Sequence, residues 1–250
     1  MTVSSERYLA EIQAAVARVG ASQAEHVGRA AEFIVAALLG DGVVQVFGSG
    51  HSEALAMEIA GRAGGLVPTN RLALRDLVMH GGESPQLLRD GKLERDPTVA
   101  HRIYKLAGVR SDDVFVIASN SGINGSVVEL ATVVKQQGHP LIAVTSADQS
   151  RELPSRHPSG RRLLELADVV LDNCAPYGDV ALHLPSGAGV CAVSSITGAL
   201  LAQMVTAEVV RRLVAAGHTP PIYLSANVPG GDEHNQALES RYAGRIRRSA

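Results

Sequence analysis

The chain has 250 residues, of which 46% are hydrophobic and 19% charged, a composition typical of a globular protein rather than a disordered one. The formal net charge of −2 at pH 7 lacks the positive excess typical of nucleic-acid-binding proteins and favours a small partner. The basic residues Arg245, Arg247 and Arg248 are a local exception, which we expect to be a solvated terminus. The length fits one domain. We expect this single domain, 1–250, to contain an N-terminal helical pair (1–40), an α/β core (41–217) and a C-terminal tail (218–250).

Cysteine usage and hydropathy indicate the compartment. The two cysteines, Cys174 and Cys191, lack the Cys-x-x-Cys spacing of a zinc site or redox pair, so we expect no metal. The longest apolar run, 198–210, is interrupted by Gln203 and Glu208 and predicts a buried helix rather than a membrane span. The chain begins polar. We therefore expect a protein of the reducing cytoplasm without a membrane partner.

The first forty residues are typical of two amphipathic helices. Apolar residues recur at helical spacing before Gly20, which is expected to end the first helix. Ser22 and Glu25 have the spacing of a capping box that opens the second helix, which ends before Gly40. The apolar stripes exceed what one thin domain needs to cover its sheet. We therefore expect these helices in the interface of a homodimer or a larger homo-oligomer.

Strands alternate with helices in the next part of the chain. This alternation, with strands that are apolar through most of their length, predicts an α/β fold with a parallel sheet covered on both faces. Pro68 confines the second strand to an edge. A long helix is expected over 189–217. The predicted strands are 43–47, 66–69, 114–118, 141–145 and 168–172.

Two turns rich in serine and glycine, 48–52 and 119–122, follow the first and third predicted strands, and each opens a helix. Helix N-termini present free N–H groups to an anion, and serine hydroxyls can donate further hydrogen bonds. If the strand order is 2-1-3-4-5, both turns face one crevice at the topological switch point. One phosphate held by Ser52, Ser119 and Ser121 is then the simplest ligand.

Nucleotide sites are the main competitors for glycine-rich turns. The first turn begins Gly-x-Gly, but Glu53 stands where a dinucleotide fingerprint needs its third glycine. The second strand ends in Thr69 and Asn70, without an acidic residue to bind a ribose. The sequence also lacks Gly-Lys-Ser and Gly-Lys-Thr. We therefore expect no nucleotide cofactor.

The segments 43–61 and 114–130 resemble the two signature segments of sugar isomerase (SIS) domains, and the resemblance extends over about 30–216. Within this family the chain is similar to a bacterial branch related to phosphoheptose isomerase and to N-acetylmuramic acid 6-phosphate etherase. The resemblance implies a three-layer flavodoxin-like sandwich, with a five-stranded parallel sheet and helices on both faces. It also implies a sugar-phosphate ligand, no cofactor, and sites completed across a homodimer. Asn124 stands where members often have Ser or Thr. The expected phosphate-binding residues are Ser49, Ser52, Ser119, Ser121 and Asn124.

Glu58 is the candidate catalytic base. The segment 58–62 resembles the stretch that carries the catalytic glutamate of phosphoheptose isomerase. Glu58 lies six residues beyond Ser52 on the predicted helix, so it can stay near the mouth of the crevice. A positioned carboxylate can remove the weakly acidic proton beside a sugar carbonyl. The alternative is an ordinary exposed helix glutamate.

Further candidates lie outside the two signature segments or within the turns. The long connection 70–112, with its own helix around Val99, is a candidate active-site lid and carries Glu83 and Glu94. Glu94 resembles the second catalytic acid of the etherase in its interval from the next strand. His51 and Asn120 are candidates for contacts with sugar hydroxyls, and His51 could also act as an acid. His234 is a further candidate acid, in the polar segment 227–235 that either folds over a site or is a solvated loop.

Removing the C2 proton begins both isomerisation and elimination of a sugar phosphate. The predicted helix 189–217 contains no histidine, whereas phosphoheptose isomerase uses one from its last helix. An acylated C2 nitrogen would also block simple aldose–ketose conversion. We therefore expect a lyase, a dehydratase of N-acetylglucosamine 6-phosphate or a relative, with isomerisation as the alternative. A non-catalytic sugar-phosphate sensor is the second alternative, although the first forty residues do not resemble a helix-turn-helix reader.

Overall fold

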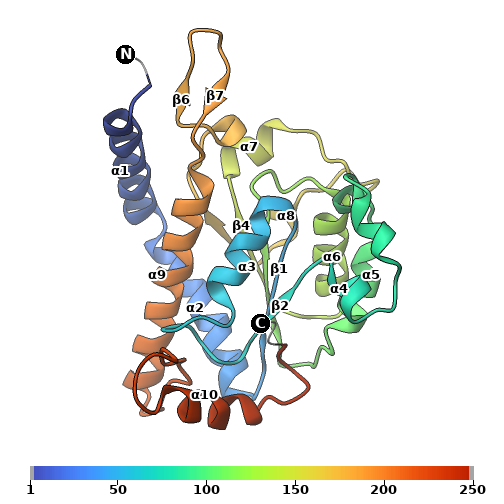
Figure 1. Cartoon of the computed structure of the whole chain (residues 1–250), viewed down its shortest axis with the longest axis vertical. Coiled ribbons are helices and arrows are strands. Elements are labelled where there is room, and N and C mark those ends of the chain that lie inside the picture. The colour runs from blue at the N-terminus through green and yellow to red at the C-terminus, as the bar shows by residue number, and fades with distance from the viewer. Residues whose placement is uncertain (1–2, 248–250) are drawn as a thin grey trace.

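A five-stranded parallel sheet lies at the centre of the chain, for which the computed structural model describes residues 3–247 (Figure 1). The strand order β2-β1-β3-β4-β5 confirms the order on which the shared crevice depends. All four neighbouring pairs are parallel. The strands are β1 (Val44–Gly48), β2 (Thr69–Leu72), β3 (Val114–Ala118), β4 (Leu141–Thr145) and β5 (Val169–Asp172).

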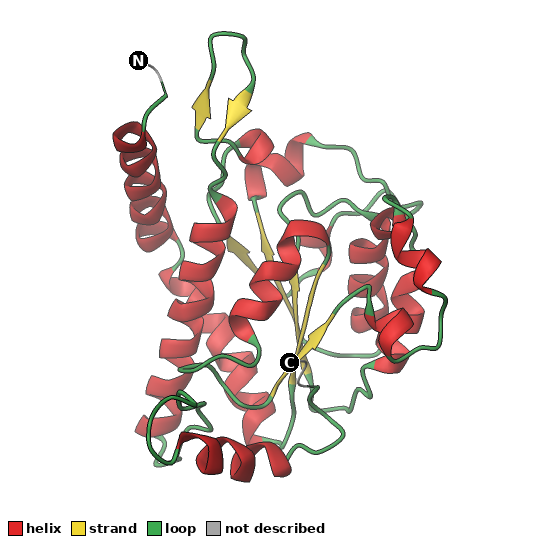
Figure 2. Cartoon of the chain, viewed as in Figure 1, coloured by secondary structure: helices red, strands yellow, loops and turns green. Residues whose placement is uncertain are grey.

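Helices cover both faces of the sheet, which confirms the three-layer α/β fold (Figure 2). On one face α2, α3 and α9 pack against inward-facing strand residues such as Val46, Val116 and Val144. On the other face α5, α6 and α8 pack against Phe47 and Phe115. The helices are α1 (Ser5–Ser22), α2 (Ala24–Leu39), α3 (Glu53–Ile59), α4 (Asp76–Met79), α5 (Val99–Leu106), α6 (Gly125–Gln136), α7 (Ala147–Glu152), α8 (Leu163–Leu166), α9 (Ser194–Ala215) and α10 (Gly231–Ser240). None of the helices in the described part is both long and apolar enough to cross a membrane.

The second strand lies later in the chain than the sequence predicted. β2 begins at Thr69 rather than at Leu66, although it does lie at an edge of the sheet. Leu66 forms an isolated antiparallel bridge to Ile222, and the Val67 N–H donates to the Pro221 carbonyl at 2.8 Å. These apolar residues are therefore buried by a distant part of the chain, which a local pattern does not reveal.

The junction between the first two helices also differs. α1 continues through Gly20 to Ser22, since one exposed glycine weakens a helix without ending it. The capping box of Ser22 and Glu25 is wrong, because the Ser22 hydroxyl donates to the Arg18 carbonyl at 2.9 Å. Gln23 forms the junction instead, and its Oε1 accepts from the Asp172 N–H at 3.0 Å. The break is thus fixed by a contact with the end of β5.

The predicted helix over 189–217 begins only at Ser194. Residues before it form a small antiparallel hairpin, β6 (Leu182–His183) and β7 (Gly189–Val190), which stands out from the body beside the start of α1 (Figure 1). The α9 helix starts where it does because Asp179 caps it. The Asp179 carboxylate accepts from the N–H groups of Val193 and Ser194 at 3.1 and 2.8 Å.

The C-terminal tail packs along the amino ends of the strands. Tyr242, which follows α10, is buried with Val43, the residue that precedes β1. The guanidinium of Arg245 is buried and forms an ion pair with Asp113, so the expectation of a solvated terminus is wrong for this residue. Arg247 also bonds to the body, through the Leu106 carbonyl. Arg248 lies outside the described residues.

Asp113 links the sheet to the tail, and its replacement should destabilise the fold. The fully buried carboxylate accepts from the Val43 N–H and the Gln45 side chain, both at 2.9 Å, and pairs with Arg245. Asp113→Ala would leave that guanidinium buried without its partner. We expect a loss of roughly 3–5 kcal/mol in the free energy of unfolding by urea denaturation. Replacement of its exposed neighbour, Asp112→Ala, is the control, and equal stability of the two variants would contradict this assignment.

Candidate functional site

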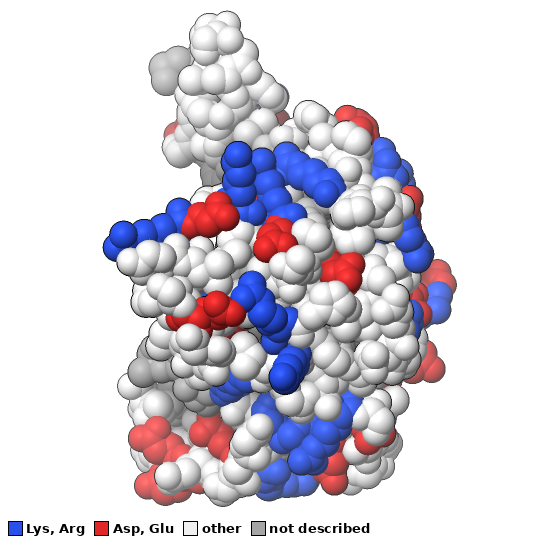
Figure 3. Space-filling model, turned by 90° about the vertical axis from the view of Figure 1, so that its right-hand side faces the viewer, with Lys and Arg blue, Asp and Glu red and all other residues white. Residues whose placement is uncertain are grey.

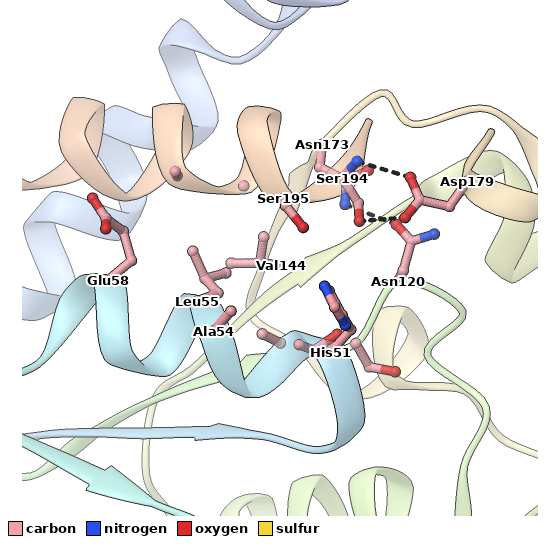
Figure 4. A pocket seen from close by; sticks show the side chains of 15 residues that line it. His51, Ala54, Leu55, Glu58, Asn120, Val144, Asn173, Asp179, Ser194 and Ser195 are labelled. Carbon is pink, nitrogen blue, oxygen red and sulfur yellow. Dashed lines mark hydrogen bonds between the residues drawn. The ribbon is translucent and has the colours of Figure 1, made fainter. Parts of the chain in front are cut away.

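The two serine-rich turns leave the sheet side by side. Gly48 and Ala118, the last residues of β1 and β3, are paired in the parallel register. A pocket of about 250 Å³ opens above this edge, between α3 and α9 (Figure 4). Ser52 from the first turn and Ser119 from the second both line it.

The first turn is a tight connection from β1 through a single 3₁₀ turn, Gly50–Ser52, into α3. It requires glycine at position 48, because a Cβ there would lie 2.3 Å from the Ser52 carbonyl oxygen. Ser52 lines the pocket, whereas Ser49 is buried and lies outside the lining. Neither hydroxyl bonds to another side chain or backbone group in the part of the chain that the structure describes.

The second turn is held open by its own hydrogen bonds. Ser119 Oγ accepts from the Gly122 N–H at 3.1 Å, and Gly122 has a φ of 65°, which favours glycine. Asn120 lines the pocket and is fixed at both ends, by Gln149 at 2.6 Å and Asn173 at 2.9 Å. Ser121 is half-buried outside the lining, and its hydroxyl has no partner among residues 3–247.

Asn124 precedes α6, and its side chain forms hydrogen bonds with two residues from distant segments. Its Oδ1 accepts from Arg156 Nη1 at 2.9 Å, and its Nδ2 donates to Glu94 Oε1 at 2.9 Å. Asn124 therefore holds a cation and an acid beside the second turn. Arg156 follows the turn by more than thirty residues and belongs to no recognisable motif, so its position could not be predicted from the sequence.

Glu58 stands at the other end of the same pocket, on the last turn of α3 (Figure 4). Its Oε1 accepts from Gln203 Nε2 of α9 at 2.7 Å and also pairs with Arg62. These contacts fix the carboxylate across the mouth between the two helices. The wall between Glu58 and the serine turns is apolar and includes Leu55, Val144 and Gly198.

The start of α9 adds polar groups that the sequence analysis missed. Ser194, Ser195 and Asp179 line the pocket, and Ser195 points toward His51 across it (Figure 4). Asp179 Oδ2 accepts from the Ser194 hydroxyl at 2.6 Å. The serine pair directly before an apolar run was a usable signal for a helix start, but it was obscured by the expectation of a helix from residue 189.

Of the remaining candidates, Glu94 lies near the two turns, whereas Glu83 and His234 lie away from them. Glu94 lies outside the pocket lining, but its carboxylate is close to both turns, since a Cβ at Gly50 would be 3.1 Å from Glu94 Oε2. Glu83 forms an ion pair with Arg102, away from the lining residues. His234 lies on α10 and donates from Nε2 to the Ile222 carbonyl at 3.0 Å. The fold of one chain therefore brings Glu94 to the turns, but not His234.

The described residues provide neither a metal site nor a strongly nucleophilic thiol near the pocket. Among residues 3–247, no cluster of three His, Cys, Asp or Glu side chains could hold a metal ion. Burial raises the pKa of the Cys174 thiol, and the charge of Asp172 raises it further. Since the thiolate is the nucleophilic form, Cys174 is poorly suited to covalent catalysis at neutral pH.

Comparison with known proteins agrees with this arrangement of sheet and turns. The family model of the SIS domain matches residues 7–146. A UPF0309 protein of Listeria monocytogenes is 42% identical over 226 residues, which cover 90% of this chain and 91% of that protein. The chain therefore belongs to the SIS domain family, together with the UPF0309 proteins.

Solved structures share the fold at low sequence identity. The phosphoheptose isomerase of Francisella tularensis has a TM-score of 0.57 and 16% identity, covering 81% of this chain and 94% of that one. The sugar isomerase domain of an RpiR transcription factor from Sphaerobacter thermophilus has a TM-score of 0.50 and 17% identity, covering 98% and 100%. The same architecture therefore occurs in an enzyme and in a regulator.

Proposed function

We propose that the chain is a sugar-phosphate lyase, a dehydratase of N-acetylglucosamine 6-phosphate or a closely related N-acetylamino sugar 6-phosphate. The observation that carries the proposal is the position of Glu58 in the same pocket as Ser52 and Ser119. A phosphate held at the turns would fix C6 of the sugar, and the other carbons of the sugar would extend along the pocket toward the carboxylate. Binding and positioning would then cooperate in proton transfer.

The phosphate would be bound by hydroxyls and by the N–H groups at the starts of α3 and α6. The Ser52 and Ser121 hydroxyls are not engaged by other residues of the described chain, and Ser119 uses only an acceptor position. Such donors are suited to a ligand rich in acceptor oxygens. Ser49 is buried and lies outside the pocket lining, so it would contribute mainly to the shape of the first turn.

Elimination would begin with Glu58 taking the C2 proton of the open-chain aldehyde, and the carbonyl would accept the electron pair as an enolate. A C2–C3 double bond would then form as the C3–O bond breaks, and the leaving hydroxide would gain a proton and depart as water. His51 lines the pocket and would donate that proton or hold a sugar hydroxyl, and Asn120, which also lines it, would hold a sugar hydroxyl. Glu94, beside both turns, is the other candidate acid. His234 would take part only in a site that a second chain completes.

The apolar wall supports an acylated amino sugar rather than a simple hexose phosphate. Leu55 and Val144 offer no hydrogen-bond partners to a hydroxyl, whereas a methyl group of an acetamide can pack against them. The acylated nitrogen at C2 also prevents simple conversion to a ketose. Elimination at C3 then remains the available outcome of proton removal.

Two alternatives share the phosphate site. Isomerisation would use the same base, but α9 has no histidine to return the proton to C1. A sensor without catalysis is the other alternative, since one similar fold belongs to a transcription factor. It is less well supported, because α1 and α2 pack against α9 and the sheet rather than forming a separate DNA-reading unit.

We also propose a homodimer, or a larger homo-oligomer, that works in the cytoplasm. The side chains of Leu9 and Val16 on α1 are 57% and 37% exposed, and they lie one heptad apart on the same face. Tyr177, which precedes the hairpin, and Leu184, within it, are also exposed, and this part of the chain packs against α1 through Ala175 and Ile12. Both cysteines are free thiols, as expected in a reducing compartment. α2 is less suited to the interface, because it is packed between α9 and the sheet.

The serine hydroxyls should contribute directly to binding of the phosphate. Ser121→Ala and Ser119→Ala should each weaken binding of N-acetylglucosamine 6-phosphate by about 0.5–3 kcal/mol in isothermal titration calorimetry. Ser121→Ala is the cleaner variant, because Ser119 also accepts a hydrogen bond within the turn. Ser111→Ala, an exposed serine before β3, is the control. Wild-type affinity in both turn variants would sink the phosphate assignment.

Glu58→Gln should strongly slow proton removal while leaving binding nearly unchanged. The amide keeps the shape of the side chain and can still accept from Gln203, but it cannot act as a base. We expect turnover to fall by about 10²–10⁴. In heavy water, wild-type protein should exchange or eliminate the C2 hydrogen, as detected by mass spectrometry, and the variant should not.

Glu53→Gln is the matched control for the base, because Glu53 lies on the same helix, pairs with Arg75 and stands outside the pocket lining. Persisting C2 exchange in Glu58→Gln would move the base to another residue. Absence of C2 exchange in the wild type, with sugar phosphate bound, would favour the sensor.

The wild-type protein should be at least a dimer by light scattering at micromolar concentration. Leu9→Glu with Val16→Glu should shift it toward monomer, because two charges would have to be desolvated in the interface. Ala14→Glu, on the opposite exposed face of α1, should leave the mass unchanged. A monomeric wild type would refute the proposal.

A further inference from the structure

An arginine from a distant segment lies beside the second turn, just outside the residues that line the pocket. The Arg156 N–H donates to the Ile123 carbonyl at 3.0 Å, and its Nη1 donates to Asn124 Oδ1 at 2.9 Å. Farther along the same segment, the Leu163 N–H donates to the Gly122 carbonyl at 2.9 Å. The segment 156–163 is therefore fastened to the turn near both of its ends, which holds the exposed guanidinium beside it.

The charge of Arg156 is not neutralised by a direct ion pair within residues 3–247. Its neighbours differ, since Arg151 pairs with Asp148 at 3.5 Å and Arg162 pairs with Glu165 at 3.1 Å. The acid that the hydrogen-bond network brings closest to Arg156 is Glu94. It accepts from Nδ2 of Asn124, whose Oδ1 accepts from Arg156. Asn124 thus separates the guanidinium from this carboxylate and leaves the positive charge available.

The pocket itself supplies little positive charge for a phosphate. Its described lining contains hydroxyls, amides and two carboxylates, those of Glu58 and Asp179, and His51 is its one basic side chain. A phosphate dianion bound only by neutral donors would remain uncompensated. Basic side chains do gather on the upper part of the face that carries α5 and α6, below the hairpin (Figure 3). The second turn borders the segment 151–162, which contains four arginines.

We propose that Arg156 is a ligand of the substrate's phosphate and that Asn124 is the residue that positions it. The inference rests on the proposed sugar-phosphate site and adds to it the cation that the serine turns lack. A guanidinium presents a planar fork of N–H groups that matches two phosphate oxygens, and it stays charged at any working pH. Asn124 then acts through Arg156, rather than as an independent phosphate ligand.

Calorimetry with N-acetylglucosamine 6-phosphate and with inorganic phosphate tests the role of Arg156. Arg156→Ala should lower the affinity for both by about 10- to 100-fold, the range for a lost charge-assisted hydrogen bond. Arg156→Lys should recover part of the loss, because it keeps the charge without the fork. Arg151→Ala on the same segment should bind as wild type, and melting curves confirm that each variant is folded.

A double-mutant cycle tests the positioning role of Asn124. If Asn124 acts through Arg156, then Asn124→Ala should weaken phosphate binding, and the double variant should bind no more weakly than Arg156→Ala alone. Fully additive losses would make Asn124 an independent ligand and overturn this part of the proposal.

Failure of the Arg156 role and failure of the proposed function give different results. If the wild type binds the sugar phosphate and Arg156→Ala binds it equally well, the role of Arg156 is refuted and the proposed function stands. If the folded wild type binds neither probe, both are overturned.

Discussion

The site depends on one topological constraint, the parallel pairing of β1 with β3 at the centre of the sheet. Because the order reverses between these strands, the connections that follow them leave in opposite directions and open a crevice between them. Both connections are tight turns that lead into helices, so hydroxyls and N–H groups are concentrated at one edge. A different strand order would leave two unrelated serine turns.

The packing of α9 against α3 turns this crevice into a pocket with two chemically different ends. The turns form the end that is rich in hydrogen-bond donors. Glu58, held by Gln203 of α9, places the carboxylate that can act as a base at the other end. The apolar wall separates them. A substrate with an anion at one end and an acidic C–H several atoms away fits this division, which is why positioning accounts for so much of the proposed catalysis.

Local patterns predicted most of the fold and the two turns. The strands, both turns and the position of Glu58 on the helix after the first turn could be predicted, because each depends on a short segment with a regular period or a required glycine. The strand order was implied by the resemblance to SIS domains. The positions of Arg156 and Asp179 could not, because each lies on a loop whose course is set by long-range contacts. For His234 the local pattern pointed to a site that the fold of one chain does not bring it to. Its polar, turn-rich segment suggested a functional loop, but the segment packs at the amino edge, where Asp113 holds the tail.

The central claim is that a phosphate at the two turns places C2 of the sugar at Glu58. A crystal structure of Glu58→Gln with N-acetylglucosamine 6-phosphate tests it directly, because the variant should retain the substrate. We expect the phosphate between the two turns, within hydrogen-bond distance of the Ser52 and Ser119 hydroxyls that line the pocket, with C2 facing the side chain of residue 58. A phosphate bound away from these turns, or a sugar that extends out of the pocket between α3 and α9, would contradict the account.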